Sequence, residues 1–265
     1  MRPNNVNRWL AVALLAASFS VSAQEASIPR YLQLARDFVT NTKQENNSYS
    51  NTHIYTRMPG DLFASEYVVA TDCGGFVEDM FRRTNSGVLE QLKTKKFKTR
   101  FSIFDWHPSI EKEEAFTRIM KVTDIKPGDV AAWLYTNKVT HTLPGHMLFI
   151  DSPPVRLNKP RKPLVDGLDQ YEVTIIDTSQ EAKSRDDTRF VSDAALRDEN
   201  EAKGKQRGSI ASPNYIGVGR GHIRFYADSV GAIKGIAFSF DRAKFHGLDD
   251  WNIVVGRPRT VSANN

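Results

Sequence analysis

The 265-residue chain contains a single cysteine, Cys73, so no internal disulfide can hold its fold together. Cys73 stands at the start of a predicted helix, because Asp72 is a good N-cap residue. Apolar residues then recur at helical spacing, at Phe76, Val77, Met80 and Phe81. The dipole and the free N–H groups of a first helical turn favour a thiolate. This location is therefore typical of a reactive cysteine.

Two interpretations of Cys73 remain open at this point. A free cysteine that shares a helical face with Val77 is often a small buried hydrophobe. Gly74 and Gly75, however, are poor helix formers, each costing about 1 kcal/mol relative to alanine. Their presence favours a site where a substrate backbone approaches the sulfur.

The N-terminus has the pattern of a secretory signal peptide over residues 1–23. Arg2 and Arg8 provide the positive charge, Trp9–Ala17 the apolar segment, and Val21–Ala23 the small-residue cleavage site. We therefore expect an exported protein, periplasmic or secreted, in which residues 24–265 form one domain. No apolar run is long enough to cross a bilayer, so we expect no stable membrane insertion. Residues 1–23 carry Arg2 and Arg8 and no acidic residue, so their removal lowers the formal charge from +5 to +3; this mild excess suits an anionic envelope polymer, and we expect no nucleic-acid partner.

The remaining pattern predicts an α+β fold, with N-terminal helices packed on an antiparallel sheet or half-barrel. Helical spacing is expected after Pro29 and again after Ser109, with Ile110, Phe116, Ile119 and Met120 facing inward. Beyond Val122 the pattern becomes extended, and residues 41–51 and 180–214 are expected to be loops, the second a charged excursion. The predicted strands are Val130–Tyr135, His146–Asp151, Tyr171–Thr178, Ile216–Tyr226, Ile233–Phe240 and Trp251–Val255.

A thiol nucleophile needs a base within hydrogen-bonding reach, and six histidines compete for that role. His146 is the best candidate, because it begins a strand at a sheet end that a helix terminus can reach. If this strand pairs in simple antiparallel register with the next, His146 faces Asp177 and Asp151 faces Glu172. Asp177 is then either the group that orients the imidazole or a turn residue after the strand.

Four weaker signals point to other chemistry. The pattern Gly217-x-Gly219-x-Gly221 resembles a phosphate loop, but no helix follows, so we interpret it as a bulged or tightly packed strand. His141 and His146 match no common zinc spacing, so no metal is expected. The charged runs Lys93–Arg100 and Ser184–Arg189 are expected to be solvated loops. The alternative for Lys93–Arg100 is a rim that binds anions, and the alternative for Ser184–Arg189 is a site for a polar ligand.

Three blocks of this sequence resemble the NlpC-type cysteine peptidases. Thr71–Val77 is similar to that family's Asp-Cys-Ser-Gly-Phe-Val signature. Pro127–Val130 and Gly145–Ile150 resemble its Pro-Gly-Asp strand and its His-Val-Gly-Ile-Tyr strand. The resemblance, which covers about residues 71–178, implies a papain-like fold with Cys73 as nucleophile, His146 as base and Asp177 as the third residue. It further implies hydrolysis of amide bonds in the stem peptides of bacterial peptidoglycan, without a cofactor.

The chain also departs from the family pattern. Gly74 stands where the family usually has serine, and the third residue there is commonly His, Asn or Gln rather than Asp. The tyrosine that the family places near its cysteine corresponds here to Tyr55 or Tyr67, and we expect Asp72 and Gly74 to contact substrate. We therefore expect an exported cysteine peptidase or amidohydrolase. The alternatives are a non-catalytic envelope-binding module on the same fold and a cysteine acyltransferase. The sequence predicts no oligomeric state.

Overall fold

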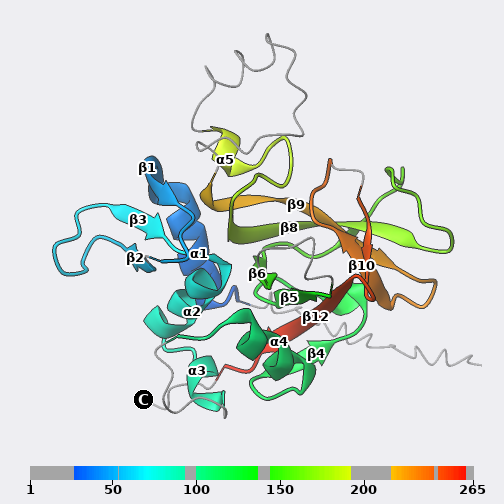
Figure 1. Ribbon diagram of the computed structural model, residues 1–265, viewed down its shortest axis with the longest axis horizontal. Coiled ribbons are helices and arrows are strands. Elements are labelled where there is room, and N and C mark those ends of the chain that lie inside the picture. Colours follow the sequence, from blue (N-terminus) through cyan, green and yellow to red (C-terminus); the bar gives the residue numbers. More distant parts are fainter. Residues whose placement is uncertain are drawn as a thin grey trace, which may run out of the picture.

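A computed structural model describes residues 27–52, 54–92, 100–136, 144–191, 216–241 and 244–260 (Figure 1). The expected signal segment, His53, His141 and residues 192–215 lie outside these ranges. The helices are α1 (Arg30–Asn41), α2 (Cys73–Arg83), α3 (Val88–Gln91), α4 (Ile103–Glu111), the 3-10 helix η1 (Val122–Asp124) and α5 (Thr188–Val191). The strands are β1 (Thr42–Ser48), β2 (Tyr55–Arg57), β3 (Tyr67–Ala70), β4 (Phe116–Ile119), β5 (Val130–Tyr135), β6 (Gly145–Ile150), β7 (Val155–Arg156), β8 (Asp169–Ser179), β9 (Gly217–Ala227), β10 (Ile233–Ala237), β11 (His246–Gly247) and β12 (Trp251–Pro258).

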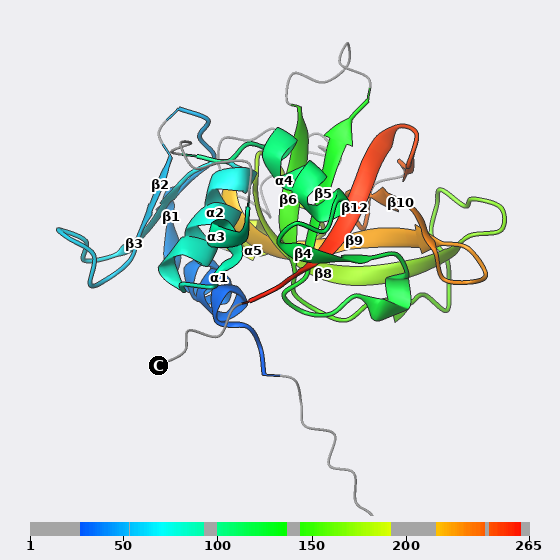
Figure 2. The same cartoon turned by 90° about the horizontal axis from the view of Figure 1, so that it is seen from below.

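Most strands belong to one nine-stranded sheet whose pairings are all antiparallel. Its order is β11-β10-β9-β8-β6-β5-β12-β4, with β7 also paired to β8. A separate three-stranded sheet has the order β1-β3-β2, in which β1 and β3 run parallel. The helices α1, α2 and α3 gather at one side of the large sheet, next to the small one (Figures 1 and 2). The expected α+β class with a large antiparallel sheet is therefore confirmed.

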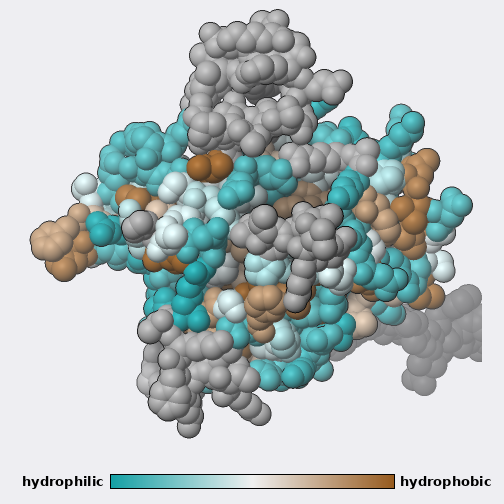
Figure 3. Space-filling model, viewed as in Figure 1, coloured by the Kyte–Doolittle hydropathy of each residue, from teal (hydrophilic) through white to brown (hydrophobic). Residues whose placement is uncertain are grey.

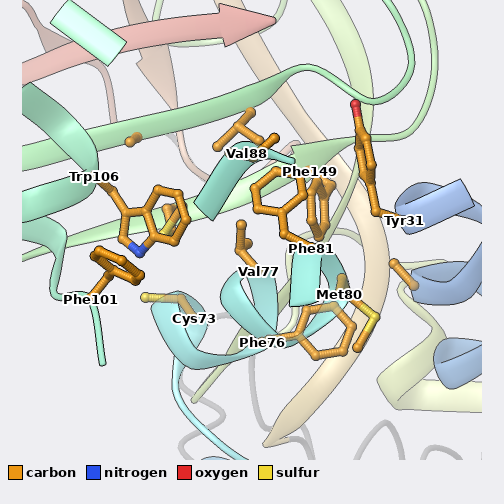
Figure 4. Packing of buried hydrophobic residues seen from close by; sticks show 14 of the residues in the cluster. Tyr31, Cys73, Phe76, Val77, Met80, Phe81, Val88, Phe101, Trp106 and Phe149 are labelled. Carbon is orange, nitrogen blue, oxygen red and sulfur yellow. The ribbon is translucent and has the colours of Figure 1, made fainter. Parts of the chain in front are cut away.

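Side-chain alternation along the central strands divides the core into two clusters on opposite faces of the sheet. On β6, Met147 and Phe149 belong to the cluster that also contains residues of α1, α2 and α4. Figure 4 shows this first cluster, with Phe149 beside Phe81 and with Cys73 at its edge near Phe101. Leu148 and Ile150 belong to the second cluster, on the other face. Helix α2 packs against β6, and its first residues, Cys73 and Gly74, line the same pocket as Gly145, the first residue of that strand.

Two expectations about secondary structure are wrong. The helix predicted after Ser109 instead begins after Ser102, whose N–H donates to the Asp105 carboxylate at 2.9 Å. The expected inward residues Phe116 and Ile119 lie in β4, where they pair with β12 rather than continuing a helix. Residues 42–48, within the loop expected over 41–51, form β1. A short polar edge strand of this kind lacks the apolar alternation that identifies strands in a sequence.

The loop between β2 and β3 protrudes from the molecule and has an apolar tip (Figure 3). Leu62 and Phe63 are 79% and 92% exposed, and Phe63 has a left-handed backbone with φ of 61°. Asp61 fixes the loop, because its carboxylate accepts from the Met58 N–H at 3.0 Å and pairs with Arg83 at 2.8 Å.

Candidate functional site

Cys73 is the first residue of α2, as the sequence predicts. The Asp72 side chain caps the helix by accepting from the Gly75 N–H at 2.8 Å. Cys73 is 8% exposed and belongs to the first core cluster, yet it also lines a pocket. The two sequence interpretations are therefore not exclusive, because one side of the residue packs on the core and the other faces the pocket.

His146 lies near the start of β6, in a buried aromatic environment. Its Nε2 is 2.8 Å from Oδ2 of Asp177, and the Cys73 side chain is a second hydrogen-bonding partner of the imidazole. The rings of Trp133 and Phe238 lie 5.2 Å and 4.8 Å from the imidazole, centroid to centroid. Burial lowers the pKa of His146, but the Cys73 sulfur and the Asp177 carboxylate outweigh it and raise the pKa to about 9. The imidazolium form is thus favoured beside the sulfur.

The strand register differs from the simple one, although the predicted proximity of His146 and Asp177 is present. β6 and β8 pair at Phe149↔Ile176 and Ile150↔Ile175, two residues away from the expected alignment. A shift of two residues preserves the side-chain face, so His146 and Asp177 meet as diagonal neighbours. The expected Asp151–Glu172 pairing is wrong. Asp151 instead pairs with Arg36 at 2.6 Å and with Arg220, while Glu172 lies opposite Arg224 of β9.

Asp177 is fully buried and bound by two cations in addition to His146. Arg189 donates from Nη2 to both the Oδ1 atom and, at 2.6 Å, the backbone carbonyl of Asp177. The Lys183 Nζ lies 3.7 Å from Oδ2. Burial raises the pKa of Asp177, but Arg189, Lys183 and His146 together hold it well below its usual range. The carboxylate therefore remains ionised beside the imidazole.

A pocket of about 190 Å³ opens at the N-terminus of α2. The lining combines apolar walls with several polar groups and one cation, Arg100, which pairs with Asp72. Arg100 is the only part of the basic run 93–100 among the described residues, and it stands at the pocket. The lining residues are Tyr49, Asn51, Asp72, Cys73, Gly74, Arg100, Phe101, Ser102, Ile103, Pro144 and Gly145.

The tyrosine at this pocket is Tyr49, and neither expected tyrosine lines it. Tyr55 is 44% exposed and stacks with Arg57, whereas the ring of Tyr67 packs edge-on against Phe38. Burial, and next the neighbouring Cys73, raise the pKa of Tyr49 well above its ordinary value, so its hydroxyl stays protonated. No local pattern marks this residue, because β1 places it there by pairing in parallel with β3, whose end leads into α2.

The two glycines after Cys73 have different roles. A Cβ on Gly75 would lie 2.3 Å from the Thr71 Oγ1 and 2.7 Å from a methyl group of Ile54, so packing alone requires glycine there. A Cβ on Gly74 would meet nothing closer than 3.7 Å, and Gly74 lines the pocket. The expectation of an open approach to the sulfur therefore applies to Gly74 and is wrong for Gly75.

The weaker sequence signals also have structural outcomes. Among the described residues, no group of three His, Cys, Asp or Glu side chains is arranged to hold a metal ion. The glycines of β9 lie within a continuous strand, as the tight-packing interpretation predicts. The expectation of a solvated loop at 184–189 fits Arg185 and Asp186, which are exposed, and is wrong for Ser184, Asp187 and Arg189, which are buried.

No helix in the described part of the chain is both long and apolar enough to span a membrane.

No family model and no solved structure matches the chain. A curated protein of Acanthamoeba polyphaga mimivirus is 26% identical over 199 residues, which cover 72% of this chain and 78% of that protein. That viral protein is itself described as uncharacterized, so the similarity suggests no activity.

Proposed function

We propose that this protein is an exported cysteine amidohydrolase of NlpC-like, papain-like fold that cleaves peptide amide bonds in peptidoglycan stem peptides. One observation carries the proposal. The only thiol of the chain stands in the first turn of a helix, at a pocket, beside an imidazole that is hydrogen-bonded to a buried carboxylate. This is the nucleophile, base and orienting group that acyl transfer requires.

Each group has a defined role in the proposed reaction. His146 takes the Cys73 proton, and the Asp177 carboxylate fixes the ring and supports its cationic form. The thiolate attacks the amide carbonyl carbon, and the backbone N–H of Cys73 donates to the developing oxyanion. When the C–N bond breaks, the imidazolium protonates the leaving amine. Water, activated by neutral His146, then hydrolyses the thioester and restores the thiol.

The pocket supports a peptide substrate that enters beside α2. The protonated Tyr49 hydroxyl and the Ser102 side chain offer hydrogen bonds along a wall that otherwise includes Phe101 and Ile103. Peptidoglycan follows from two sequence arguments, the signal-peptide pattern and the family resemblance. The carboxylates of a stem peptide complement the Arg100 cation at the same pocket.

Product analysis tests the proposal. Purified protein lacking residues 1–23 is incubated with isolated peptidoglycan and with synthetic stem peptides, and the products are identified by mass spectrometry. The matched control is Cys73→Ala. We expect new amine and carboxylate ends with the native protein only. If neither material is cleaved while the thiol reacts readily with alkylating agents, the cell-wall substrate is wrong. Transfer of the acyl group to an added amine would instead identify an acyltransferase.

A further inference from the structure

The segment Lys183–Arg189 crosses the face of the sheet on which Asp177 and His146 lie; we call it the strap. Although the strap is rich in charge, the side chains of Lys183 and Arg189 are 0% and 1% exposed. Asp187 is also buried, pairs with Arg189 at 2.8 Å and accepts from the Lys183 N–H at 2.7 Å. Burial of two cations and a carboxylate is costly, so such groups are rarely buried unless they are paired.

The glycines of β9 make room for the strap. Gly219 lies directly opposite Asp177, and Gly221 lies opposite Ile175, so both glycines face the same side as Asp177. A Cβ on Gly219 would lie 2.6 Å from the Arg189 side chain, and one on Gly221 would lie 2.4 Å from the Asp187 carboxylate. Gly219 and Gly221 thus leave space beside Asp177, and the charged side chains of the strap fill that space.

The strap cations are held in place on several sides. Lys183 donates to the Ser179 Oγ at 2.7 Å, and its Nζ lies 3.6 Å from the centre of the Phe238 ring. The same ring contacts His146. Arg189 donates from Nε to the Gly217 carbonyl at 3.0 Å, which anchors the guanidinium on β9 while it binds Asp177.

We propose that the strap is a positioning element of the Cys73–His146 pair, in which Lys183 and Arg189 hold the Asp177 carboxylate and set the pH range over which the thiolate forms. Lys183 and His146 contact the same carboxylate oxygen of Asp177, so the ammonium and the imidazole are near neighbours. Burial lowers the pKa of Lys183, while the Asp177 and Glu181 carboxylates act to raise it. In its charged form, Lys183 favours the thiolate and opposes the imidazolium, whereas Asp177 has the reverse effect. The charged and titratable groups around the pair come from several elements: Asp72, which caps α2, with its partner Arg100, Tyr49 after β1, Tyr135 of β5, Asp177 of β8, and Glu181, Lys183, Asp187 and Arg189.

The direction of the effect follows from charge. Replacing Lys183 by an apolar residue removes a cation, which raises both the pKa at which the thiolate forms and that at which the imidazolium loses its proton. At an effective dielectric constant of about 20, a unit charge several ångströms from a titrating group shifts the pKa of that group by about one to two units. The catalytic consequence rests on the proposed function, but the shift in thiol ionisation does not.

The single cysteine makes the test direct. The rate of Cys73 alkylation by iodoacetamide is measured from about pH 4 to about pH 10 in the native protein and in Lys183→Met, a variant of similar size. We expect the profile of the variant to move to higher pH by about one unit. Arg224→Met is the control, because Arg224 is a buried cation that lies opposite Glu172, five residues along β8 from Asp177, and donates to Gln170 Oε1 at 2.9 Å rather than to Asp177. Its profile should stay in place.

A second variant leaves every charge intact. Gly219→Ala places a methyl group where the Arg189 side chain lies, so that side chain must move away. We expect the alkylation profile to shift in the same direction as in Lys183→Met. If a variant does not fold, or if iodoacetamide does not reach the thiol, the ring signals of His146 are titrated by NMR in Lys183→Gln, where its pKa should rise above the native value. Profiles or His146 titrations that superimpose on those of the native protein would overturn the proposal. A shifted thiol profile without any substrate cleavage would leave this inference standing and refute only the proposed function.

Discussion

Replacing Asp177 with asparagine changes one atom and removes the charge that three buried groups share. The amide oxygen can still accept from His146, but Lys183 and Arg189 lose their common counter-ion. At 3.7 Å and an effective dielectric of about 20, the interaction of Lys183 with Asp177 alone is worth about 4 kcal/mol. Breaking a buried ion pair by removing one partner typically costs about 3–5 kcal/mol.

We therefore expect Asp177→Asn to lower the free energy of unfolding at neutral pH by about 3–4 kcal/mol, which corresponds to roughly 10 °C in the melting temperature for a domain of this size. Urea denaturation followed by tryptophan fluorescence measures the loss, with the exposed Asp166→Asn as the matched control. A loss below about 1 kcal/mol would show that Asp177 does not compensate the two cations, and the account of the strap would fail.

Three further predictions concern the site itself. Cys73→Ala should abolish turnover while lowering the free energy of unfolding by only about 1 kcal/mol, because the sulfur lies at the edge of the core. Retained activity with a large fall in melting temperature would instead identify a core cysteine. Asp177→Asn should slow turnover less than His146→Ala does, since an amide oxygen still orients the ring, and equal losses would contradict this division of roles. The pKa of His146, followed by NMR, should be about 9 in the native protein and lower in Cys73→Ala. The pKa of His146 in the folded protein exceeds the ordinary 6.5, so the imidazolium contributes stability that is complete below about pH 6.5 and is lost as the pH rises through about 9. The native protein should therefore lose more stability than His146→Gln between these two pH values.

Local patterns in the sequence were sufficient to predict α2 and the main strands. Asp72 and the apolar face of α2 specify a helix start without reference to the rest of the chain. The proximity of His146 and Asp177 followed from strand parity, which survives a register error of two residues. A one-residue error would have placed the two side chains on opposite faces.

The missed features depend on long-range packing. Tyr49 reaches the pocket because the polar strand β1 pairs in parallel with β3, a contact without any local signature. The burial of Lys183 and Arg189 depends on Gly219 and Gly221 of β9, which are distant in sequence. A charge-dense run is normally solvated, so only the three-dimensional complement of glycines and carboxylates reverses that expectation.

The central claim is that His146 activates Cys73, and the pH dependence of thiol alkylation in native protein and in His146→Ala tests it most directly. An unassisted thiol ionises near pH 8.5. We predict that native Cys73 is alkylated faster than the thiol of His146→Ala at neutral and mildly acidic pH, and that this difference disappears in alkaline solution, where any thiol ionises. Superimposable profiles, both rising only above about pH 8, would contradict the account, because the cysteine would then be an ordinary thiol at the edge of the core.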